Sequence, residues 1–435
     1  MLRGVSRHFT APAHRVHSLA NGVNLVFAPM PHMASVSVGF WMAVGGRHES
    51  VELNGVSHFI EHMLFKGTRR RSARQISEAV EGVGGYVNAF TSEEHTCYYA
   101  RAPQKQFELL VDVLADMVRN PLFESSEIDK ERSVIKEEIA MYLDQPHHYV
   151  QEVLNAALWP EHPLGRSLTG TPEGLDRLGR TELKGFHRTH YTGANLTISV
   201  AGNLSERRLL AALRPVAAGM PQGTARPYEA APPVPRRPGV RLITRDTEQT
   251  QAALGVRTCA RHDPRRYALR LLNAVLGENM SSRLFVSLRE DRGLAYSVGS
   301  SISFFEDAGD LVVSLGLETR NLPEALRLIT AEMRRLTERA PGRVEFQRAL
   351  DYSLGQIDLG LESTESRMNW LGEQYLGHGR LVAPAVLKRR MAEVRPADVR
   401  QVAREFFRAG RASLALVSPL KRAGQLRPLL GGLPA

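Results

Sequence analysis

The alternation of apolar and polar positions along the chain predicts the same order of elements twice. The first half predicts strands over Gly22–Ala28, Ala34–Val44 and Tyr86–Tyr99, and helices over Phe107–Val118 and Ile128–Leu143. The second half predicts strands over Thr250–Val256, Tyr296–Phe304 and Asp310–Leu317, and helices over Tyr267–Leu276, Arg283–Arg289, Leu322–Leu336 and Val344–Leu361. Residues Ile128–Ile139 can be laid over Phe346–Ile357 without a gap, which indicates an internal duplication.

The stretch Gly219–Gly239 separates the two halves. It contains six prolines, which resist both a helix and a central strand. With 435 residues the chain is too long for one ordinary core. We therefore predict an N-terminal domain over residues 1–218, a linker over 219–239 and a C-terminal domain over 240–435. Because strands and helices do not alternate one for one, the predicted fold class is α+β, with a mostly antiparallel sheet packed with helices in each domain.

Composition narrows the classes of function. Hydrophobic residues make up 43% and charged residues 23%, as in folded globular proteins. The net charge of +10 comes mostly from scattered arginines without a nucleic-acid-binding motif, so nucleic acid is not a predicted partner. No apolar run is long enough to span a bilayer. Cys97 and Cys259 are too far apart for a redox or metal pair, and Cys97, inside a strand-like run, is predicted to be a buried thiol.

The N-terminal segment bears on location. Residues 1–8 lack the apolar core of a secretory signal. No acidic residue precedes Glu49, as in mitochondrial leaders, but the strand-like run Gly22–Ala28 begins too early for a long leader. A cytoplasmic location is therefore predicted, with the mitochondrial matrix as the alternative.

Candidate chemistry begins in the segment Val56–Leu64. Its apolar residues recur at helical spacing, which places His58 and His62 one turn apart with Glu61 beside them, opposite the apolar stripe. Two such imidazoles can bind one ion next to a carboxylate, which is the His-x-x-Glu-His pattern of inverted zinc helices. A solvent-facing helix side that carries two histidines by accident has the same pattern. A third ligand separates the two interpretations.

A catalytic zinc needs three protein ligands and one open position for water. On the helix predicted before the midpoint of the chain, Glu131 and Glu138 are seven residues apart and project together, whereas Glu137 points away. A metal would account for one partly buried carboxylate, and the other could orient a neighbouring ligand. Ordinary salt bridges to Lys130 or Arg132 are the alternative.

Together these motifs resemble the pitrilysin-like zinc peptidases, the M16 or inverzincin family, and especially the processing-peptidase subgroup with its bacterial homologues. The resemblance covers most of the chain and extends to His62–Thr68, Asn88–Ser92, Glu131–Ile135, Ser281–Phe285 and Leu288–Tyr296. It implies two similar α+β halves. It also implies that His58, His62 and Glu138 are the metal ligands, Glu61 the general base and Glu131 a supporting carboxylate.

Substrate contacts are implied by the same resemblance. Arg289 and Tyr296 match a pair that grips substrate near the metal, although by themselves they would be read as a helix-end arginine and a half-buried aromatic. An extended peptide is expected to add to the edge of a sheet. The strand residues expected to contact it are Asn88, Ala89, Phe90 and Thr91.

The second half has no His-x-x-Glu-His pattern. Gln356 takes the place of Glu138, and Ala349 that of Glu131, which predicts one Zn²⁺ per chain. Glu93 and Glu94, next to the substrate strand, could attract basic peptides or could simply be solvated.

The predicted function is that of a zinc metalloendopeptidase that hydrolyses extended or unfolded peptides. The family encloses substrate between two two-domain units, and this chain supplies one. A homodimer is therefore implied, in which Arg289 and Tyr296 of one chain face the zinc site of the other. Two alternatives remain: a presequence-processing subunit that needs a different partner, and a non-catalytic scaffold subunit, although scaffold subunits have usually lost metal ligands.

Overall fold

The structure is a computed structural model that describes residues 14–225, 227–234, 239–422, 424 and 426–434. Residues 1–13, which contributed to the prediction of location, lie outside the described part, as do residues 226 and 235–238 of the predicted linker. The described linker residues 221–234 form neither helix nor strand. No helix within the described ranges is long and apolar enough to cross a membrane.

Each half is built from strands and helices in a closely similar order. The first half contains β1 (Arg15–Ser18), β2 (Asn24–Pro29), β3 (Ser35–Met42), α1 (Val56–Met63), α2 (Ala73–Glu81), β4 (Tyr86–Thr91), β5 (Thr96–Pro103), α3 (Phe107–Arg119), α4 (Ser125–Leu143), α5 (Pro146–Leu158), α6 (Pro172–Leu175), α7 (Arg180–His190), β6 (Leu196–Gly202) and α8 (Glu206–Ala218). The second contains β7 (Gly239–Thr244), β8 (Thr250–Thr258), α9 (Arg266–Leu276), the π-helical turn Phe285–Glu290, β9 (Ala295–Phe304), β10 (Gly309–Leu317), α10 (Leu322–Glu338), α11 (Arg343–Leu359), α12 (Thr364–His378), α13 (Pro384–Ala392), α14 (Pro396–Phe406), β11 (Ala412–Ser418) and α15 (Arg427–Leu430).

The two sheets share one topology. Strand order is β1-β2-β6-β3-β5-β4 in the first sheet and β7-β11-β8-β10-β9 in the second. Apart from the parallel pairs β2–β6 and β7–β11, neighbouring strands run antiparallel. The fold class is therefore α+β with mostly antiparallel sheets. The run Tyr86–Tyr99, predicted as one stretch of strand, is interrupted by a turn at residues 92–95, so β4 and β5 form a hairpin.

Helices α4 and α11 support the predicted duplication. They begin at Ser125 and Arg343, the same separation as that between Ile128 and Phe346 in the sequence overlay. Each helix also follows the same pair of antiparallel strands and one preceding helix. Apart from β1, each strand of the first half therefore has a structural counterpart in the second.

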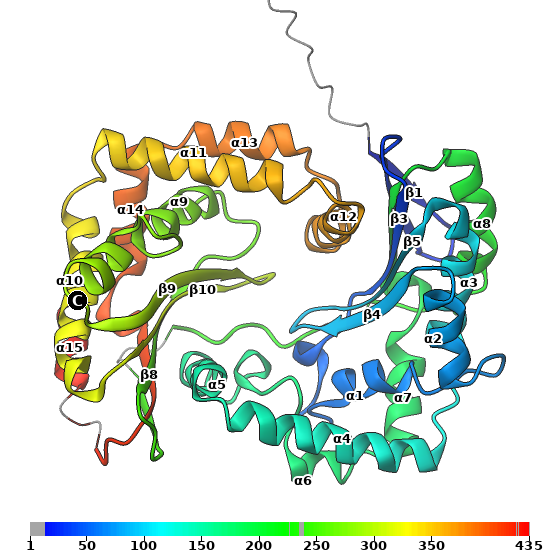
Figure 1. The fold of residues 1–435 in the computed structure, drawn as a ribbon, viewed down its shortest axis with the longest axis horizontal. Helices are drawn as coiled ribbons and strands as arrows, with labels where there is room; N and C mark the ends of the chain where they lie inside the picture. The colour runs from blue at the N-terminus through cyan, green and yellow to red at the C-terminus, as the bar shows by residue number, and fades with distance from the viewer. Residues whose placement is uncertain (1–13, 226, 235–238, 423, 425, 435) are drawn as a thin grey trace, which may run out of the picture.

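One helix from each half covers the sheet of the other (Figure 1). Helix α5 packs on β8 and β11, where Leu154 and Leu158 join a buried cluster with Ala253 and Val417. Helix α12 packs on β2, β3 and β6. Each sheet is therefore completed by a helix from the opposite side of the linker.

Small residues let these exchanged helices approach closely. A Cβ atom added to Gly372 of α12 would lie 2.1 Å from the Trp41 ring, and one added to Gly39 would lie 2.4 Å from Met368 Sδ. In the second sheet a Cβ atom on Gly255 would lie 2.7 Å from a methyl group of Leu158. Glycine is thus required on both sheets by the packing of the incoming helix.

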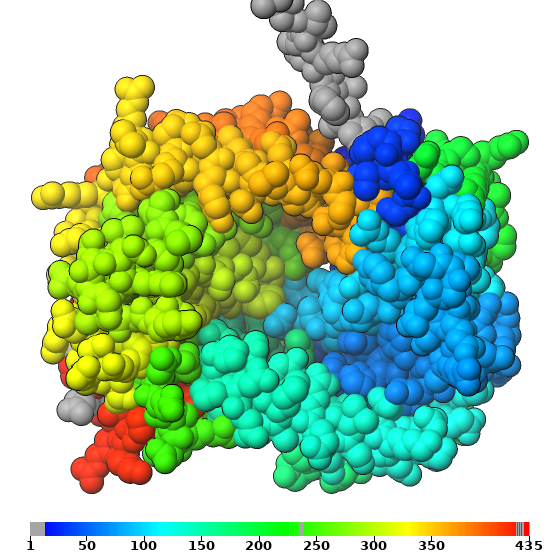
Figure 2. All heavy atoms as spheres, viewed as in Figure 1, coloured from blue at the N-terminus to red at the C-terminus, as the bar shows by residue number. Residues whose placement is uncertain are grey.

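Strands β4 and β9 are the last strands of their sheets, and both point towards the space between the halves (Figure 1). The space-filling view shows that the molecule is hollowed there (Figure 2). Each of these strands pairs with only one neighbour in the sheet, so its other edge keeps unpaired backbone groups.

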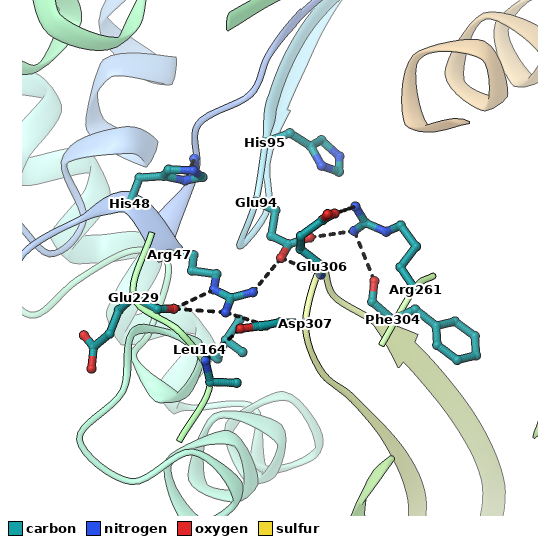
Figure 3. Close-up of polar contacts among 12 residues, drawn as sticks. Arg47, His48, Glu94, His95, Leu164, Glu229, Arg261, Phe304, Glu306 and Asp307 are labelled. Atoms are coloured by element: carbon teal, nitrogen blue, oxygen red, sulfur yellow. Dashed lines mark hydrogen bonds and ion pairs between the residues drawn. The ribbon is translucent and has the colours of Figure 1, made fainter. Parts of the chain in front are cut away.

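A buried ion network ties the halves and the linker together (Figure 3). Arg47 has a fully buried side chain and donates to Glu94 at 2.8 Å, to Asp307 at 2.6 Å and to the Glu229 carbonyl at 3.0 Å. Glu94 also accepts from Arg261 at 2.6 Å. The side chain of Glu94 is therefore an internal structural acid, and neither of the two sequence-based interpretations of it, substrate attraction or simple solvation, is correct.

Candidate metal centre

Helix α1 begins in a tightly defined turn. Gly55 has a φ of 93°, and a Cβ atom there would lie 2.8 Å from the Thr169 carbonyl oxygen, so glycine is favoured on both counts. The buried carboxylate of Glu49 accepts from the backbone N–H groups of Gly55 and Ser57, both at 2.8 Å. A negative group at a helix N-terminus satisfies free donors and favours the helix dipole. This arrangement sets the position of His58, one residue further along.

Three side chains converge between α1 and α4. The Nε2 atoms of His58 and His62 lie 3.7 Å and 3.6 Å from Oε2 of Glu138. Within the described residues, this is the one group of three or more His, Cys, Asp or Glu side chains whose ligand atoms gather within 4.8 Å. All three side chains are half-buried. The three residues predicted as ligands are thus brought together.

Glu131 fixes the ring of His62. Its Oε2 lies 3.0 Å from His62 Nδ1, and Lys66 lies 2.5 Å from its other oxygen. A carboxylate can only accept, so Nδ1 carries the proton and the Nε2 lone pair is left facing Glu138. The alternative salt bridges are excluded, because Lys130 pairs with Glu127 and Arg132 with Asp129.

His58 has no comparable support. Its Nδ1 is buried and has no hydrogen-bond partner among the described residues. Burial, and then the neighbouring His62, lower the pKa of His58 to about 3. The imidazole is therefore neutral near pH 7 and keeps the lone pair that metal binding requires.

Glu61 lies on the same helix and is held by β4. The hydroxyl of Thr91 donates to its Oε2 at 2.5 Å. Burial raises the pKa of Glu61, and the charge of Glu138 raises it further, whereas Thr91 and His62 lower it. A carboxylate with a raised pKa is a stronger base towards water.

The donor set fits zinc. Two imidazole nitrogens and one carboxylate oxygen form a common catalytic zinc triad, and two ligands at ~2.0–2.1 Å from a tetrahedral ion lie roughly 3.3 Å apart. The separations of 3.6 Å and 3.7 Å are close to that spacing and too long for hydrogen bonds. The Nδ1 of His58 is buried and has no partner among the described residues that would orient the ring, unlike Nδ1 of His62.

The four strand residues predicted to contact substrate differ in their surroundings. Asn88 is exposed and its side chain accepts from the backbone N–H of Ala89 at 2.8 Å. Phe90 packs edge-on against Trp41, with ring centroids 5.6 Å apart, so its side chain contacts protein. Thr91 contacts Glu61, as described above. The group that this edge presents to a peptide is thus the backbone of β4, because not all four side chains are free to contact substrate.

Arg289 and Tyr296 lie beside each other, at 5.9 Å from guanidinium to ring centroid, and Tyr296 is 76% exposed. Neither contacts His58, His62 or Glu138 anywhere in the described part of the chain. The end of β9 that meets the first half is the opposite one, at Phe304, roughly 26 Å along the strand at ~3.3 Å per residue. The pair is therefore assembled, but away from the metal residues of its own chain.

Two contributors to the centre could not be identified from the sequence pattern. Glu49 caps α1 from outside the helix, and Lys66 contacts Glu131 after the helix has ended. Lys66 follows His62 by four residues, and this spacing is the only local sign of its role.

Two family models match the chain. Residues 26–172 match the family model described as insulinase (peptidase family M16), and residues 177–352 match the model described as the peptidase M16 inactive domain.

Relatives named as uncharacterized zinc proteases align along nearly the whole chain. One from Streptomyces coelicolor is 38% identical over 93% of this chain and 89% of its own length. One from Bacillus subtilis is 37% identical over 93% and 98%, and one from Mycobacterium tuberculosis (strain H37Rv) is 36% identical over 97% and 98%.

Solved structures match the fold. A protease from Helicobacter pylori superposes with a TM-score of 0.88 at 20% identity, over 94% of this chain and 100% of that one. A structure from Pseudomonas fluorescens described as a peptidase M16 inactive domain gives 0.87 at 20% identity, over 94% and 98%.

Proposed function

Because the chain belongs to peptidase family M16, we propose that it is a zinc metalloendopeptidase that hydrolyses extended or unfolded peptides. The observation that carries the proposal is the convergence of His58, His62 and Glu138, with Glu61 on the adjoining turn of α1. The zinc-protease names of relatives at 36–38% identity support the choice of metal and reaction class.

Zinc, when bound, would lower the pKa of a water and polarise the peptide carbonyl. Glu61 accepts the proton of the attacking water and later returns it to the leaving amine. Thr91 holds one oxygen of Glu61, which keeps the base aimed at the space beside the ligands. Glu131 holds His62 in the tautomer that leaves Nε2 free.

The edge of β4 supports a preference for extended substrate. A peptide that adds to this edge is held by backbone hydrogen bonds, which demand an extended conformation more than a particular sequence. Thr91, at the end of the strand, touches Glu61, so a peptide along β4 passes the catalytic base. Unfolded polypeptides should therefore be cut and rigid globular proteins spared.

Metal analysis tests the proposal. Purified protein is expected to contain about one zinc per chain and to lose cleavage of a quenched fluorescent peptide library when treated with a chelator. Added zinc should restore cleavage. The variant His58→Ala is expected to lose both metal and cleavage, because only two ligands remain.

The matched control is His147→Ala, an exposed histidine on α5, which should keep both metal and cleavage. Zinc-free protein that still cleaves the library at the original rate would contradict the proposal, as would His58→Ala protein with full zinc content.

We further propose that the active assembly is a homodimer in which Arg289 and Tyr296 serve the metal site of the partner chain. Their position at the end of β9 opposite the one that meets the first half supports this arrangement. Mixing an inactive His62→Ala chain with an inactive Arg289→Ala chain is expected to restore part of the peptide cleavage, because one site in the mixed dimer is then intact.

Size-exclusion chromatography with light scattering of each variant serves as the control for dimer formation. Mixed dimers that form but regain no cleavage would exclude shared sites. A distinct partner subunit, as in presequence processing, would leave the wild-type chain inactive alone. The scaffold alternative is disfavoured by the complete set of metal residues.

A further inference from the structure

A cavity of about 750 Å³ lies in the second half, between α9, α11, α12 and the end of β9. In Figure 2 the molecule is hollowed between the green and orange segments that carry these elements. One residue of the first half, His95, also lines the cavity. His95 belongs to the turn after β4, so the cavity opens next to the proposed substrate strand.

The elements that wall this cavity are the counterparts of those that build the metal centre. Helices α9 and α11 correspond to α1 and α4, and β9 corresponds to β4, because the order of elements and the strand order match in both halves. The cavity thus occupies, in the second half, the place that the metal centre occupies in the first.

Burial allows more than one register between α1 and α9, and one of them matches three buried positions in each helix. In α1, buried Phe59 and Ile60 are followed by buried Met63; in α9, buried Ala268 and Leu269 are followed by buried Leu272 at the same spacing. This alignment sets Arg270 opposite Glu61.

The surroundings of the two residues agree with this alignment. Glu61 is touched by Thr91 at the end of β4, and Arg270 lies 5.3 Å from the ring of Phe304 at the end of β9. Gln356, which replaces Glu138, lines the same cavity. The second half therefore has the cation Arg270 where the first has Glu61. It has the neutral amide Gln356 where the first has Glu138.

The guanidinium N–H donors of Arg270 are unpaired in the described part of the chain. It lines the cavity, is exposed to solvent, and has no hydrogen bond or ion pair with any described residue. A guanidinium carries five N–H donors and keeps its charge, so Arg270 can bind an anion that enters the cavity.

The other cations in the cavity already have partners. Arg266 donates to the Tyr267 hydroxyl at 2.9 Å and contacts His378 Nε2 at 3.2 Å. Arg261 is paired with Glu94 and also donates to the Phe304 carbonyl, as Figure 3 shows. Arg270 is thus the cavity cation left for a ligand.

Two acids also line the cavity, and neither pairs with Arg270. Glu278 accepts from Asn273 at 3.0 Å. Glu373 is farther from Arg270 than an ion-pair distance; burial raises its pKa, whereas the charges of Arg261 and Arg270 lower it.

We propose that this cavity binds a carboxylate of the peptide substrate, with Arg270 as the main contact. The proposal rests on the proposed peptidase function and adds a preference to it. His95, in the turn directly after β4, lines the cavity, so a carboxylate on a peptide bound along β4 can reach Arg270. The carboxylate is either the C-terminus of the peptide or an acidic side chain.

Binding is measured first without turnover. In the Glu61→Gln background, labelled peptides of equal length carry a free or amidated C-terminus and an internal Glu or Gln, and their affinities are compared by fluorescence anisotropy. Loss of a charge-assisted contact is expected to weaken binding roughly tenfold. Amidation has that effect if the C-terminus is bound, and Glu→Gln has it if the side chain is bound.

Arg270→Gln is expected to remove the difference between acidic and neutral peptides, and Arg270→Lys to keep part of it. Arg320→Gln, a substitution of an 81% exposed arginine, is the control and should keep the full difference. If Arg270→Gln does not fold, Arg270→Lys tests the proposal, because its difference in affinity between acidic and neutral peptides is expected to be smaller than that of the wild type.

Equal affinity for all four peptides, tighter binding of the amidated Gln peptide, or a preference that Arg270→Gln or Arg270→Lys leaves at full size would overturn the proposal. Failure of the peptidase function would show itself separately, as an absence of cleavage of every peptide by zinc-loaded wild-type protein.

Discussion

Replacing Glu61 by Gln is expected to lower kcat for peptide cleavage by roughly 10²- to 10⁴-fold while zinc stays bound. Glutamine keeps the size of the side chain and can still meet the Thr91 hydroxyl, but it cannot accept the proton of the attacking water. The metal residues are unchanged, so zinc content should stay at about one per chain. Steady-state kinetics on a quenched fluorescent peptide and metal analysis of the same sample check both parts.

Glu137→Gln is the matched control. Glu137 is an exposed glutamate on α4, next to Glu138 in sequence, and points away from the centre. Its substitution should leave kcat and zinc content unchanged. A zinc-loaded Glu61→Gln variant with undiminished kcat would exclude Glu61 as the base.

The second large effect concerns stability. Arg47→Met is expected to lower the free energy of unfolding by about 3–5 kcal/mol, because breaking a buried pair leaves its partner charges without compensation. Asp307 would lose its ion-pair partner, and Glu94 would keep Arg261 as its remaining cationic partner. Chemical denaturation followed by circular dichroism measures the change.

An exposed ion pair provides the comparison. Arg74 is 86% exposed and pairs with Glu78 one helical turn away, so Arg74→Met should cost about 0–1 kcal/mol. Adding Asp307→Asn to the Arg47→Met protein should recover part of the loss, because one uncompensated charge disappears. Equal destabilisation by the two arginine substitutions would show that the buried network adds no stability.

The predictable part of the metal centre is the part encoded within single helices. His58, Glu61 and His62 are related by one turn of α1, and Glu131 and Glu138 by two turns of α4, so apolar periodicity alone gives their relative directions. That the two helices face each other is a long-range contact with no periodic signature. Resemblance to the peptidase family supplied that link, and the 3.6 Å and 3.7 Å separations agree with it.

The contacts that were missed connect segments far apart in sequence. Nothing near Glu94 indicates that Arg47 and Arg261 will neutralise it, so two adjacent acids looked solvated. Glu49 likewise precedes α1 by several residues, and its carboxylate accepts a hydrogen bond from the backbone N–H of Ser57 in the first turn of the helix. The two-stranded hairpin within Tyr86–Tyr99 was missed because Ser92 and His95 form a turn without glycine or proline.

The duplication was visible in the order of elements, but the exchange of helices was not. The apolar faces of α5 and α12 predict that each helix packs against other parts of the protein. They do not predict which of the two sheets it packs against. Both possible sheets present apolar residues of similar size. Only the close approach to glycines on β3 and β8 distinguishes them, and a glycine in a strand has several other common explanations.

The exchanged helices also set the order in which the chain can finish folding during synthesis. Domains generally fold from the N-terminal end as they leave the ribosome, at about 5–20 residues per second. Here the face of the first sheet around Trp41 and Ala201 stays uncovered until α12 has been made, long after β6 is complete. A nascent chain stalled at the linker would expose that apolar face, which makes it a binding site for chaperones until the rest of the protein arrives.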